Sequence, residues 1–503
     1  MREAYRPQLK LCNCNGTMSI DAKSLASALK TAVPVKVHSQ LCRAELGEFE
    51  ASVRDNPDCL VACTQEAPLF KEVADKRADA LRFVNIRETA GWSAEAEQAT
   101  PKIAALIALA EMPRPAPVAS VSYRSNGRLL IVGPAAIALP WAEKLASQLE
   151  VSVLSTDARG SVLPATRAFP LWSGRVQSLK GYLGAFEATW SQENPIDLDQ
   201  CTRCNACISA CPEGAIDFAY QVDAARCTGH RACVEACAGI GAIDFNRVPA
   251  SKKEAFDLVL DLCDTPVISV AHKPQGYFAP GRDPLAQSFA AMELLQLVGE
   301  FEKPKFFEYE ARLCAHGRSR KTGCSNCIDV CSTGAIRSAG DKVEVDPYLC
   351  AGCGACSAVC PSGAMRYAYP RTSDIGAQLK KTLKTYREAG GNNAALLLHS
   401  ATGSGAIGES ARRGRGLPAH VIPLERFHVA AIGLDTLLGA VAYGAHQVFI
   451  LASLEERSEY ADSIHATMQL GETILHALGY AGRHFALLPA EDGAAMEAVV
   501  WQS

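Results

Sequence analysis

The sequence has no large excess of charge of either sign and no long apolar run. Its 503 residues include 50 Lys and Arg against 54 Asp and Glu, a formal net charge of −4. This balance gives no electrostatic reason to expect binding to nucleic acid or to an anionic membrane. No uninterrupted apolar run reaches about 18 residues, the length that spans a bilayer, and Met1–Lys10 is too polar for a signal peptide. We therefore expect a cytoplasmic protein with no membrane span.

Cysteine, in contrast, is abundant. Of 21 cysteines, five lie within 12–63, seven within 201–237, eight within 314–360 and one at 263. A reducing cytoplasm keeps dithiols open, so the pattern favours metal thiolates over a disulfide framework. Cysteine-free stretches separate these blocks, and we take the changes as domain boundaries. At about 150 residues per domain, the length suggests three to four domains.

The second block opens with a run typical of bacterial ferredoxins. It follows C-x2-C-x2-C-x3-C-P, in which the fourth cysteine binds the other cluster of a pair. Three thiolates on one tight loop hold three corners of a cubane, whereas a zinc ribbon has no third cysteine at this spacing. The spacing predicts that one cluster is bound by Cys201, Cys204, Cys207 and Cys237.

The partner half of this module lacks one cysteine. The second ligand position is occupied by His230, so the other cluster would be held by Cys211, Cys227 and Cys233, with His230 or nothing at the fourth corner. Three alternatives stay open. The site is a histidine-ligated [4Fe–4S] cluster, a [3Fe–4S] cluster that has lost a corner, or a cluster beside a bystander histidine. An imidazole ligand would raise the potential, as it does in Rieske centres.

The third block repeats the two-cluster pattern. An insertion, 316–323, stretches the first spacer, but the remaining spacings are kept. Similar Gly-Ala-Ile or Gly-Ala-Met segments follow each half in both blocks, which indicates duplicated modules. The ligands predicted for one cluster are Cys314, Cys324, Cys327 and Cys360, and those for the other are Cys331, Cys350, Cys353 and Cys356.

The first block follows no ferredoxin spacing. Its cysteines, Cys12, Cys14, Cys42, Cys59 and Cys63, could bind zinc or a cluster, or remain free thiols. However, residues 8–75 resemble the N-terminal domain of the A subunit of heterodisulfide reductase in the C-x-C-N, L-C-R and L-V-A-C-T segments, the last of which stands where that family has V-x-A-C-S or V-x-A-C-T. The resemblance implies a [4Fe–4S] cluster bound by all but Cys59. We leave Cys59 and Cys263 without a metal.

A nucleotide-binding fold is suggested twice, each time imperfectly. Residues 128–157 read as strand, helix and strand, but the fingerprint glycines after Gly133 are alanines, where a methyl group hinders pyrophosphate approach. We expect a relic βαβ layer with no flavin. In the tail, Gly403, Gly405 and Gly408 match G-x-G-x-x-G but begin four residues beyond the expected strand, so we interpret the match as chance or a flexible loop.

The expected fold is multidomain, α/β and α+β. The tail alternates apolar runs, 394–399, 419–424, 447–452 and 484–489, with helical patterns, which is typical of α/β domains. The domains expected in order are a heterodisulfide-reductase-A-like domain (1–100), a degenerate Rossmann-like βαβ segment (120–195), ferredoxin module 1 (196–250), a connecting segment (251–305), ferredoxin module 2 (306–370) and a cysteine-free α/β domain (371–503).

This order, together with the text at 299–307 and 313–316, resembles the large ferredoxin-like protein associated with molybdenum or tungsten formate dehydrogenases. The resemblance implies an electron-transfer protein with four or five [4Fe–4S] clusters and no active site of its own. It would pass single electrons between a formate dehydrogenase, or a similar oxidoreductase, and a second redox protein. The alternatives are a flavin-containing, electron-bifurcating subunit similar to heterodisulfide reductase A, and a scaffold that assists dehydrogenase maturation.

Overall fold

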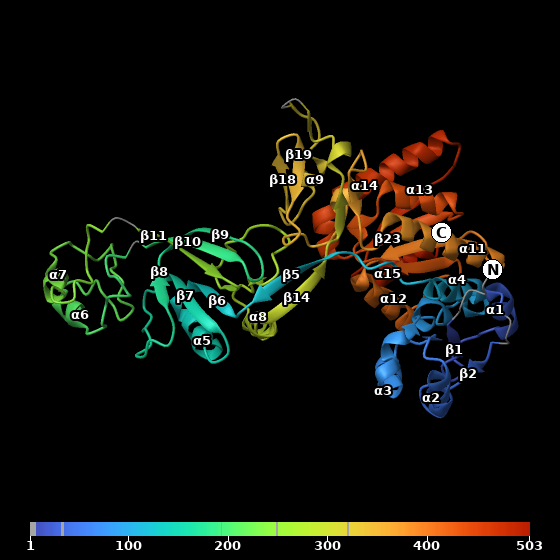
Figure 1. The fold of residues 1–503 in the computed structure, drawn as a ribbon, viewed down its shortest axis with the longest axis horizontal. Coiled ribbons are helices and arrows are strands. Elements are labelled where there is room, and N and C mark those ends of the chain that lie inside the picture. The colour runs from blue at the N-terminus through green and yellow to red at the C-terminus, as the bar shows by residue number, and fades with distance from the viewer. Residues whose placement is uncertain (1–6, 32–34, 193, 248–249, 319–320) are drawn as a thin grey trace.

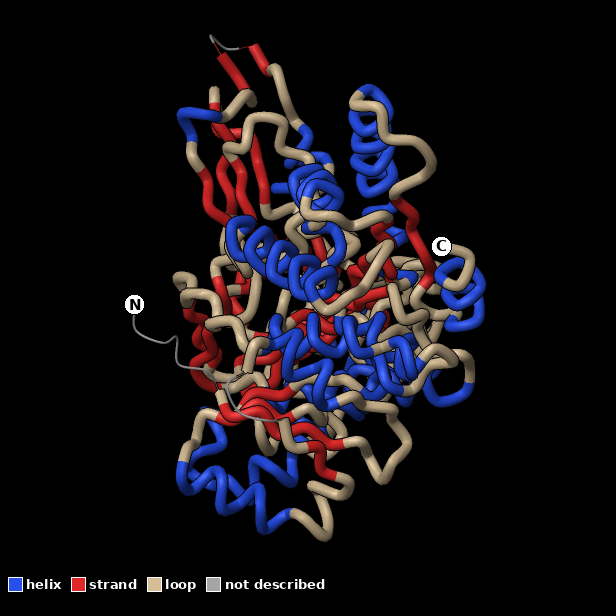
Figure 2. The backbone as a smooth tube through the Cα atoms, turned by 90° about the vertical axis from the view of Figure 1, so that its right-hand side faces the viewer, coloured by secondary structure: helices blue, strands red, loops and turns tan. Residues whose placement is uncertain are grey.

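The chain folds into several modules arranged along one long axis (Figure 1). The computed structural model describes residues 7–503 except 32–34, 193, 248–249 and 319–320. One end is formed by the segment that carries the short helices α6 (Ala206–Ala210) and α7 (Ala232–Ala236). The other end is formed by the two α/β domains at the start and finish of the chain. Figure 2 looks onto that second end, where helices lie in front of many of the strands.

The N-terminal domain is a small parallel sheet with helices. The strand order is β2-β1-β3-β4, and every pairing is parallel. Helix α1 begins where the Asp21 side chain accepts hydrogen bonds from the first free amides of the helix. The elements are β1 (Gln8–Cys12), α1 (Ala22–Leu29), β2 (Val37–His38), α2 (Leu46–Asp55), β3 (Cys59–Val61), α3 (Ala67–Ala74), β4 (Arg82–Phe83), the π-helical turn η2 (Arg87–Gly91) and α4 (Thr100–Ala110).

The C-terminal domain is a second parallel sheet of the same strand order, β22-β21-β23-β24. Its four strands lie at the four apolar runs of the tail, so the α/β prediction for this region is confirmed. The elements are α11 (Thr372–Glu388), β21 (Ala395–His399), α12 (Ala401–Arg413), β22 (Val421–Glu425), the short η5 (Val429–Ala431), α13 (Leu434–Ala442), β23 (Gln447–Ala452), α14 (Leu454–Ala477), β24 (Phe485–Pro489) and α15 (Gly493–Val500).

These two domains share one hydrophobic core, although more than 250 residues separate them in the chain. Helix α4 packs against α11, and buried side chains of both domains belong to a single cluster. The buried Lys102 ammonium of α4 donates hydrogen bonds to the carbonyl oxygens of Leu417 and Pro418, at 3.2 and 2.8 Å. Burial of apolar surface between the domains therefore holds the chain ends together as one body.

The middle of the chain leaves this body and returns to it through a two-stranded ribbon. Strand β5 (Ser120–Ser125) pairs antiparallel with β14 (Gly299–Pro304). Beyond the ribbon lies a five-stranded parallel sheet, β13-β12-β6-β7-β8, beside a three-stranded antiparallel sheet, β11-β10-β9. Their elements are β6 (Arg128–Pro134), α5 (Ala135–Leu145), β7 (Glu150–Asp157), β8 (Leu171–Ser173), β9 (Arg175–Lys180), β10 (Phe186–Gln192), β11 (Ala250–Phe256), β12 (Leu258–Asp261), β13 (Tyr277–Phe278) and α8 (Pro284–Gln296).

This arrangement differs from the linear order expected from the sequence. Strands β6 and β7 with α5 form the expected βαβ unit. However, residues 251–305 do not merely connect two modules, because β11 pairs with β10, β12 pairs with β6, and β14 pairs with β5. The first ferredoxin region is thus an insertion in the middle domain. The hydrogen bonds of buried strand edges account for this nesting, since β6 would lack a partner on one side without β12.

The second ferredoxin region lies between the ribbon and the C-terminal domain. Its elements are β15 (Phe307–Tyr309), β16 (Gly317–Arg318), β17 (Lys321–Thr322), α9 (Asn326–Asp329), β18 (Ile336–Ala339), β19 (Lys342–Val345), α10 (Ala355–Ala358) and β20 (Met365–Tyr367). The expected insertion forms the β16–β17 pair, with Ser319 and Arg320 outside the described residues. Among the described helices, none is long and apolar enough to cross a membrane.

Candidate metal centres

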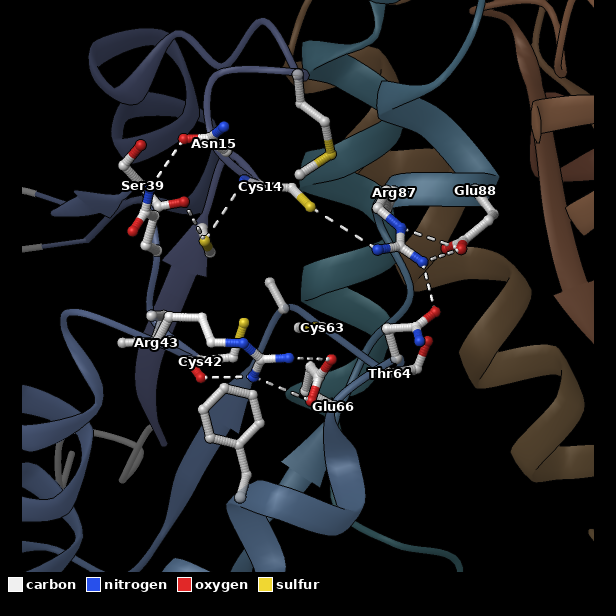
Figure 3. A pocket seen from close by; sticks show the side chains of 17 residues that line it. Cys14, Asn15, Ser39, Cys42, Arg43, Cys63, Thr64, Glu66, Arg87 and Glu88 are labelled. Atoms are coloured by element: carbon white, nitrogen blue, oxygen red, sulfur yellow. Dashed lines mark hydrogen bonds and ion pairs between the residues drawn. The ribbon is translucent and has the colours of Figure 1, made fainter.

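The N-terminal cysteines meet at the carboxyl edge of a parallel sheet. Cys12 ends β1, Cys42 follows β2 and Cys63 follows β3, so strands far apart in the sequence bring their thiols to the same edge. With Cys14, these side chains line one cavity of about 340 Å³ (Figure 3). Cys59, which starts β3, is fully buried in the hydrophobic core and does not line the cavity.

Hydrogen-bond donors surround these N-terminal sulfurs. The Cys14 amide donates to Cys12 Sγ at 3.4 Å, and the Arg87 guanidinium donates to Cys14 Sγ at 3.7 Å. Burial raises the pKa of the Cys63 thiol, and the nearby Cys42 and Cys12 thiols add to this shift. A thiol of this kind stays protonated at neutral pH unless a metal binds it. Four thiols with donors to sulfur form a suitable donor set for an anionic iron–sulfur cluster.

The first ferredoxin region brings its cysteines together in two groups. Cys201, Cys204, Cys207 and Cys237 line one small cavity, which is the grouping that the sequence spacing predicts. Burial, together with the neighbouring Cys201 and Cys237 thiols, raises the pKa of Cys207 to about 11. The loop turns through left-handed backbone at Arg203, whose amide donates to Cys201 Sγ at 3.4 Å.

The second group holds three cysteines and the odd histidine. Cys211, Cys227 and Cys233 line a second cavity together with His230 and Glu213. The His230 Nε2 atom lies 2.6 Å from Glu213 Oε2, and the amide of Ala232 donates to His230 Nδ1 at 3.1 Å. Ligand atoms of Cys211, Glu213 and His230 all lie within 4.8 Å of one another. The corner without a cysteine therefore faces a hydrogen-bonded carboxylate–imidazole pair.

The second ferredoxin region also forms two groups. The Cys327 thiol interacts electrostatically with those of Cys314, Cys324 and Cys360, and burial raises its pKa to about 11. The half-buried Cys356 thiol interacts most strongly with Cys353, Cys350 and Cys331, and less with Cys327 of the first group. Burial raises the pKa of Cys356 well above the usual value. Each group is the one predicted from the crossed ferredoxin spacing.

One residue of the C-terminal domain reaches the second ferredoxin region. Tyr460 of α14 lies close enough to the Cys353 thiol to interact with it, and its hydroxyl lies 2.5 Å from Ser332 Oγ. Tyr460 is buried, and no sequence signal near it points to a sulfur contact. The contact of Arg87 with Cys14 was not predicted, because the two residues lie 73 positions apart. Glu213 follows Cys211-Pro212 directly, so its place beside the second group could have been predicted from the sequence.

The remaining candidate positions lie apart from the cysteine groups. Cys263 is half-buried, and burial with the nearby Asp261 raises its pKa to about 12. Asp157, the acidic residue that ends β7, is paired with Arg159 at 2.8 Å. Gly403, Gly405 and Gly408 lie inside helix α12, so of the two interpretations of this match, chance or a flexible loop, the flexible loop was wrong.

Comparison with known families agrees with the two ferredoxin-type regions. Residues 194–238 and residues 322–364 each match a family described as a 4Fe-4S dicluster domain. The chain carries two dicluster ferredoxin domains. No curated protein matches it. The domains support iron–sulfur electron transfer as a capacity of the chain, since bound clusters of this type accept and release single electrons.

Proposed function

We propose that this protein carries single electrons between a formate dehydrogenase, or a similar molybdenum or tungsten oxidoreductase, and a second redox protein. The observation that supports the proposal is the pair of dicluster domains, whose cysteines lie near one another in groups. The N-terminal group adds a fifth candidate centre in a cavity with its own donors. The formate connection rests on resemblance.

The spatial separation of the two domains supports two docking surfaces. The middle domain lies between the first ferredoxin domain and the body formed by the second ferredoxin domain and the chain ends (Figure 1). The first domain is exposed at the tip, where Cys204, Phe218 and Ile240 are open to solvent. We propose that one redox partner docks at this tip and the other at the body.

The chain's own residues would bind each cluster and shield it. Thiols with raised pKa, such as Cys207 and Cys327, release their protons on binding iron, and apolar neighbours such as Ile196 and Ile243 limit water at the first centre. At the incomplete corner we propose three thiolates, Cys211, Cys227 and Cys233, with the Glu213–His230 pair beside the open position.

The test is anaerobic purification followed by iron analysis, flavin analysis and EPR. Five centres predict about 20 irons per chain and no flavin. Replacing Cys327 with Ser should remove about four irons, while Cys59→Ser, a buried cysteine outside the groups, should remove none. A three-iron EPR signal that disappears in His230→Cys would support the open corner. An iron content of eight or fewer, or one flavin per chain, would contradict the proposal.

Reduction by formate tests the partner. The purified protein with catalytic amounts of the formate dehydrogenase should bleach in the visible spectrum when formate is added. Full bleaching by dithionite but none by formate plus dehydrogenase would refute the partner assignment and leave the iron–sulfur assignment intact. That outcome would instead favour the scaffold role.

A further inference from the structure

A further cavity, of about 600 Å³ and separate from the cysteine-lined ones, lies where the N- and C-terminal domains meet. Phe83, at the end of β4, lines it from one domain, and His399 and Glu425, at the ends of β21 and β22, line it from the other. Ligands of parallel α/β sheets bind at the carboxyl ends of the strands, and small-molecule sites of this volume are common at domain interfaces. This cavity satisfies both conditions.

The cavity adjoins the N-terminal cysteine group. Thr64, Gln65 and Glu88 line both this cavity and the one that holds the four cysteines, and Thr64 directly follows Cys63. Figure 3 shows Thr64 and Glu88 beside Arg87, which bonds to Cys14. One layer of side chains therefore separates the two cavities, so a molecule in the larger one would lie next to the N-terminal centre.

The electrostatics of the cavity disfavour phosphate and other strong anions. At the start of α12, where an α/β fold commonly binds phosphate, the buried Glu456 carboxylate already accepts hydrogen bonds from Ser400 Oγ and the Ser453 amide. Arg412 is the arginine among the described lining residues, and its guanidinium is paired with the Glu88 carboxylate at 3.0 Å. Burial lowers the pKa of His399, which keeps its imidazole neutral. The lining also carries the exposed carboxylate of Glu425, so the cavity suits an uncharged molecule over an anion.

The shape of the cavity suits a flat ring. Gly405 and Gly408 give α12 a face without side chains, and a Cβ at either position would meet no atom within 4 Å. The apolar side chains of Phe83, Leu106 and Leu109 supply other parts of the wall. A planar ring can lie against a helix backbone of this kind and still bury its apolar surface.

Neutral polar groups complete the lining. Gln65 and Asn85 offer amide N–H donors, while their amide oxygens already accept from Arg87 and from the Glu88 amide; Ser404 offers a hydroxyl. The His399 Nδ1–H donates to the Ser400 carbonyl oxygen at 2.9 Å, which leaves Nε2 as an acceptor. Such groups recognise ring carbonyl and ring N–H functions and give no preference for ionised ligands.

We propose that this cavity binds an uncharged, planar redox carrier with ring carbonyl groups, namely a quinone. Its redox role, but not its binding, rests on the proposed electron-transfer function. In that role the carrier accepts two electrons, delivered singly by the reduced iron–sulfur protein, and two protons from water. A quinone is thereby reduced to a hydroquinone, and the protein is reoxidised by two electrons.

The test measures binding to the full-length, anaerobically purified protein by isothermal titration calorimetry. The probes are 2,3-dimethyl-1,4-naphthoquinone, whose blocked ring positions do not react with thiols, riboflavin as a phosphate-free isoalloxazine, and NAD⁺ as a phosphate-bearing contrast. Gly408→Leu fills the cavity, and Gly439→Leu, in α13 with no atom within 4 Å of its Cβ, is the matched control. Both substitutions favour helix formation, so both variants should fold.

We expect the quinone to bind to the wild type and to Gly439→Leu, with affinity at least tenfold lower in Gly408→Leu. Bound quinone should also alter the EPR spectrum of the N-terminal centre. Binding of NAD⁺ or riboflavin alone, quinone binding unaffected by Gly408→Leu, or no binding of any probe would overturn the inference. The proposed function fails separately, through low iron content, whereas a full iron content without ligand binding refutes only the cavity assignment.

Discussion

Removing the Tyr460 hydroxyl should make one centre of the second ferredoxin domain harder to reduce. This hydroxyl interacts with the half-buried Cys353 thiol and lies 2.5 Å from Ser332 Oγ, and we assign it as a donor to the cluster sulfur. A donor to a cluster sulfur stabilises the more negative, reduced state more than the oxidised state. The Tyr460→Phe variant keeps the ring and its packing and removes only the hydroxyl.

The expected shift follows from the energy of one hydrogen bond. A hydrogen bond to a charged acceptor contributes about 1.5–3 kcal/mol net. Only the part that changes with the oxidation state affects the potential, and we take this as about 0.5–1.4 kcal/mol. Because about 1.4 kcal/mol corresponds to about 59 mV for one electron, the potential should fall by about 20–60 mV.

An EPR-monitored redox titration of the full-length protein measures this shift. Tyr443→Phe, a more exposed tyrosine of the same domain, serves as the control and should shift no potential. Ser332→Ala, which removes the partner of the Tyr460 hydroxyl, should give a smaller fall. A potential that rises in Tyr460→Phe, or that stays within about 10 mV of the wild type, would refute the assigned hydrogen bond.

Three further predictions concern other parts of the molecule. Arg87→Ala should lower the potential of the N-terminal centre in the same titration, and Arg87→Lys should recover part of the loss, since Arg87 donates to Cys14 Sγ. Cys356→Ser should remove about four irons by chemical analysis while the first ferredoxin domain keeps its own EPR signals. Burial lowers the pKa of Lys102 to about 7, below its value of 10.5 in the unfolded chain. Unfolding therefore takes up a proton between about pH 7 and 10.5, and the stability of the folded protein rises with pH over this window. In Lys102→Met the thermal midpoint should rise less over the same window.

Short-range patterns predicted several parts of this protein well. The four apolar runs of the tail are strands, and residues 128–157 form the expected βαβ unit, because strand and helix periodicity is a local property. The ferredoxin cysteine groups agree with the spacing because each loop places three thiols around one point whatever surrounds it.

Contacts between distant residues could not be predicted in this way. Strand pairing of 250–261 with the middle domain, the ribbon of β5 and β14, and the shared core of α4 and α11 depend on which edges and faces remain unpaired after the chain collapses. The approach of Tyr460 to Cys353 has the same origin. No spacing rule links two residues that lie more than 100 positions apart.

The sequence by itself determined the local chemistry of this protein: which thiols are close in the chain, where one is replaced by His230, and which segments are strands or helices. Only the tertiary structure decided what surrounds that chemistry. It nests the first ferredoxin domain in the middle domain, aligns the N-terminal cysteines at one sheet edge and forms a cavity beside them. The reason is physical: covalent spacing constrains neighbours in the chain, whereas burial of apolar surface and pairing of strand edges select neighbours in space.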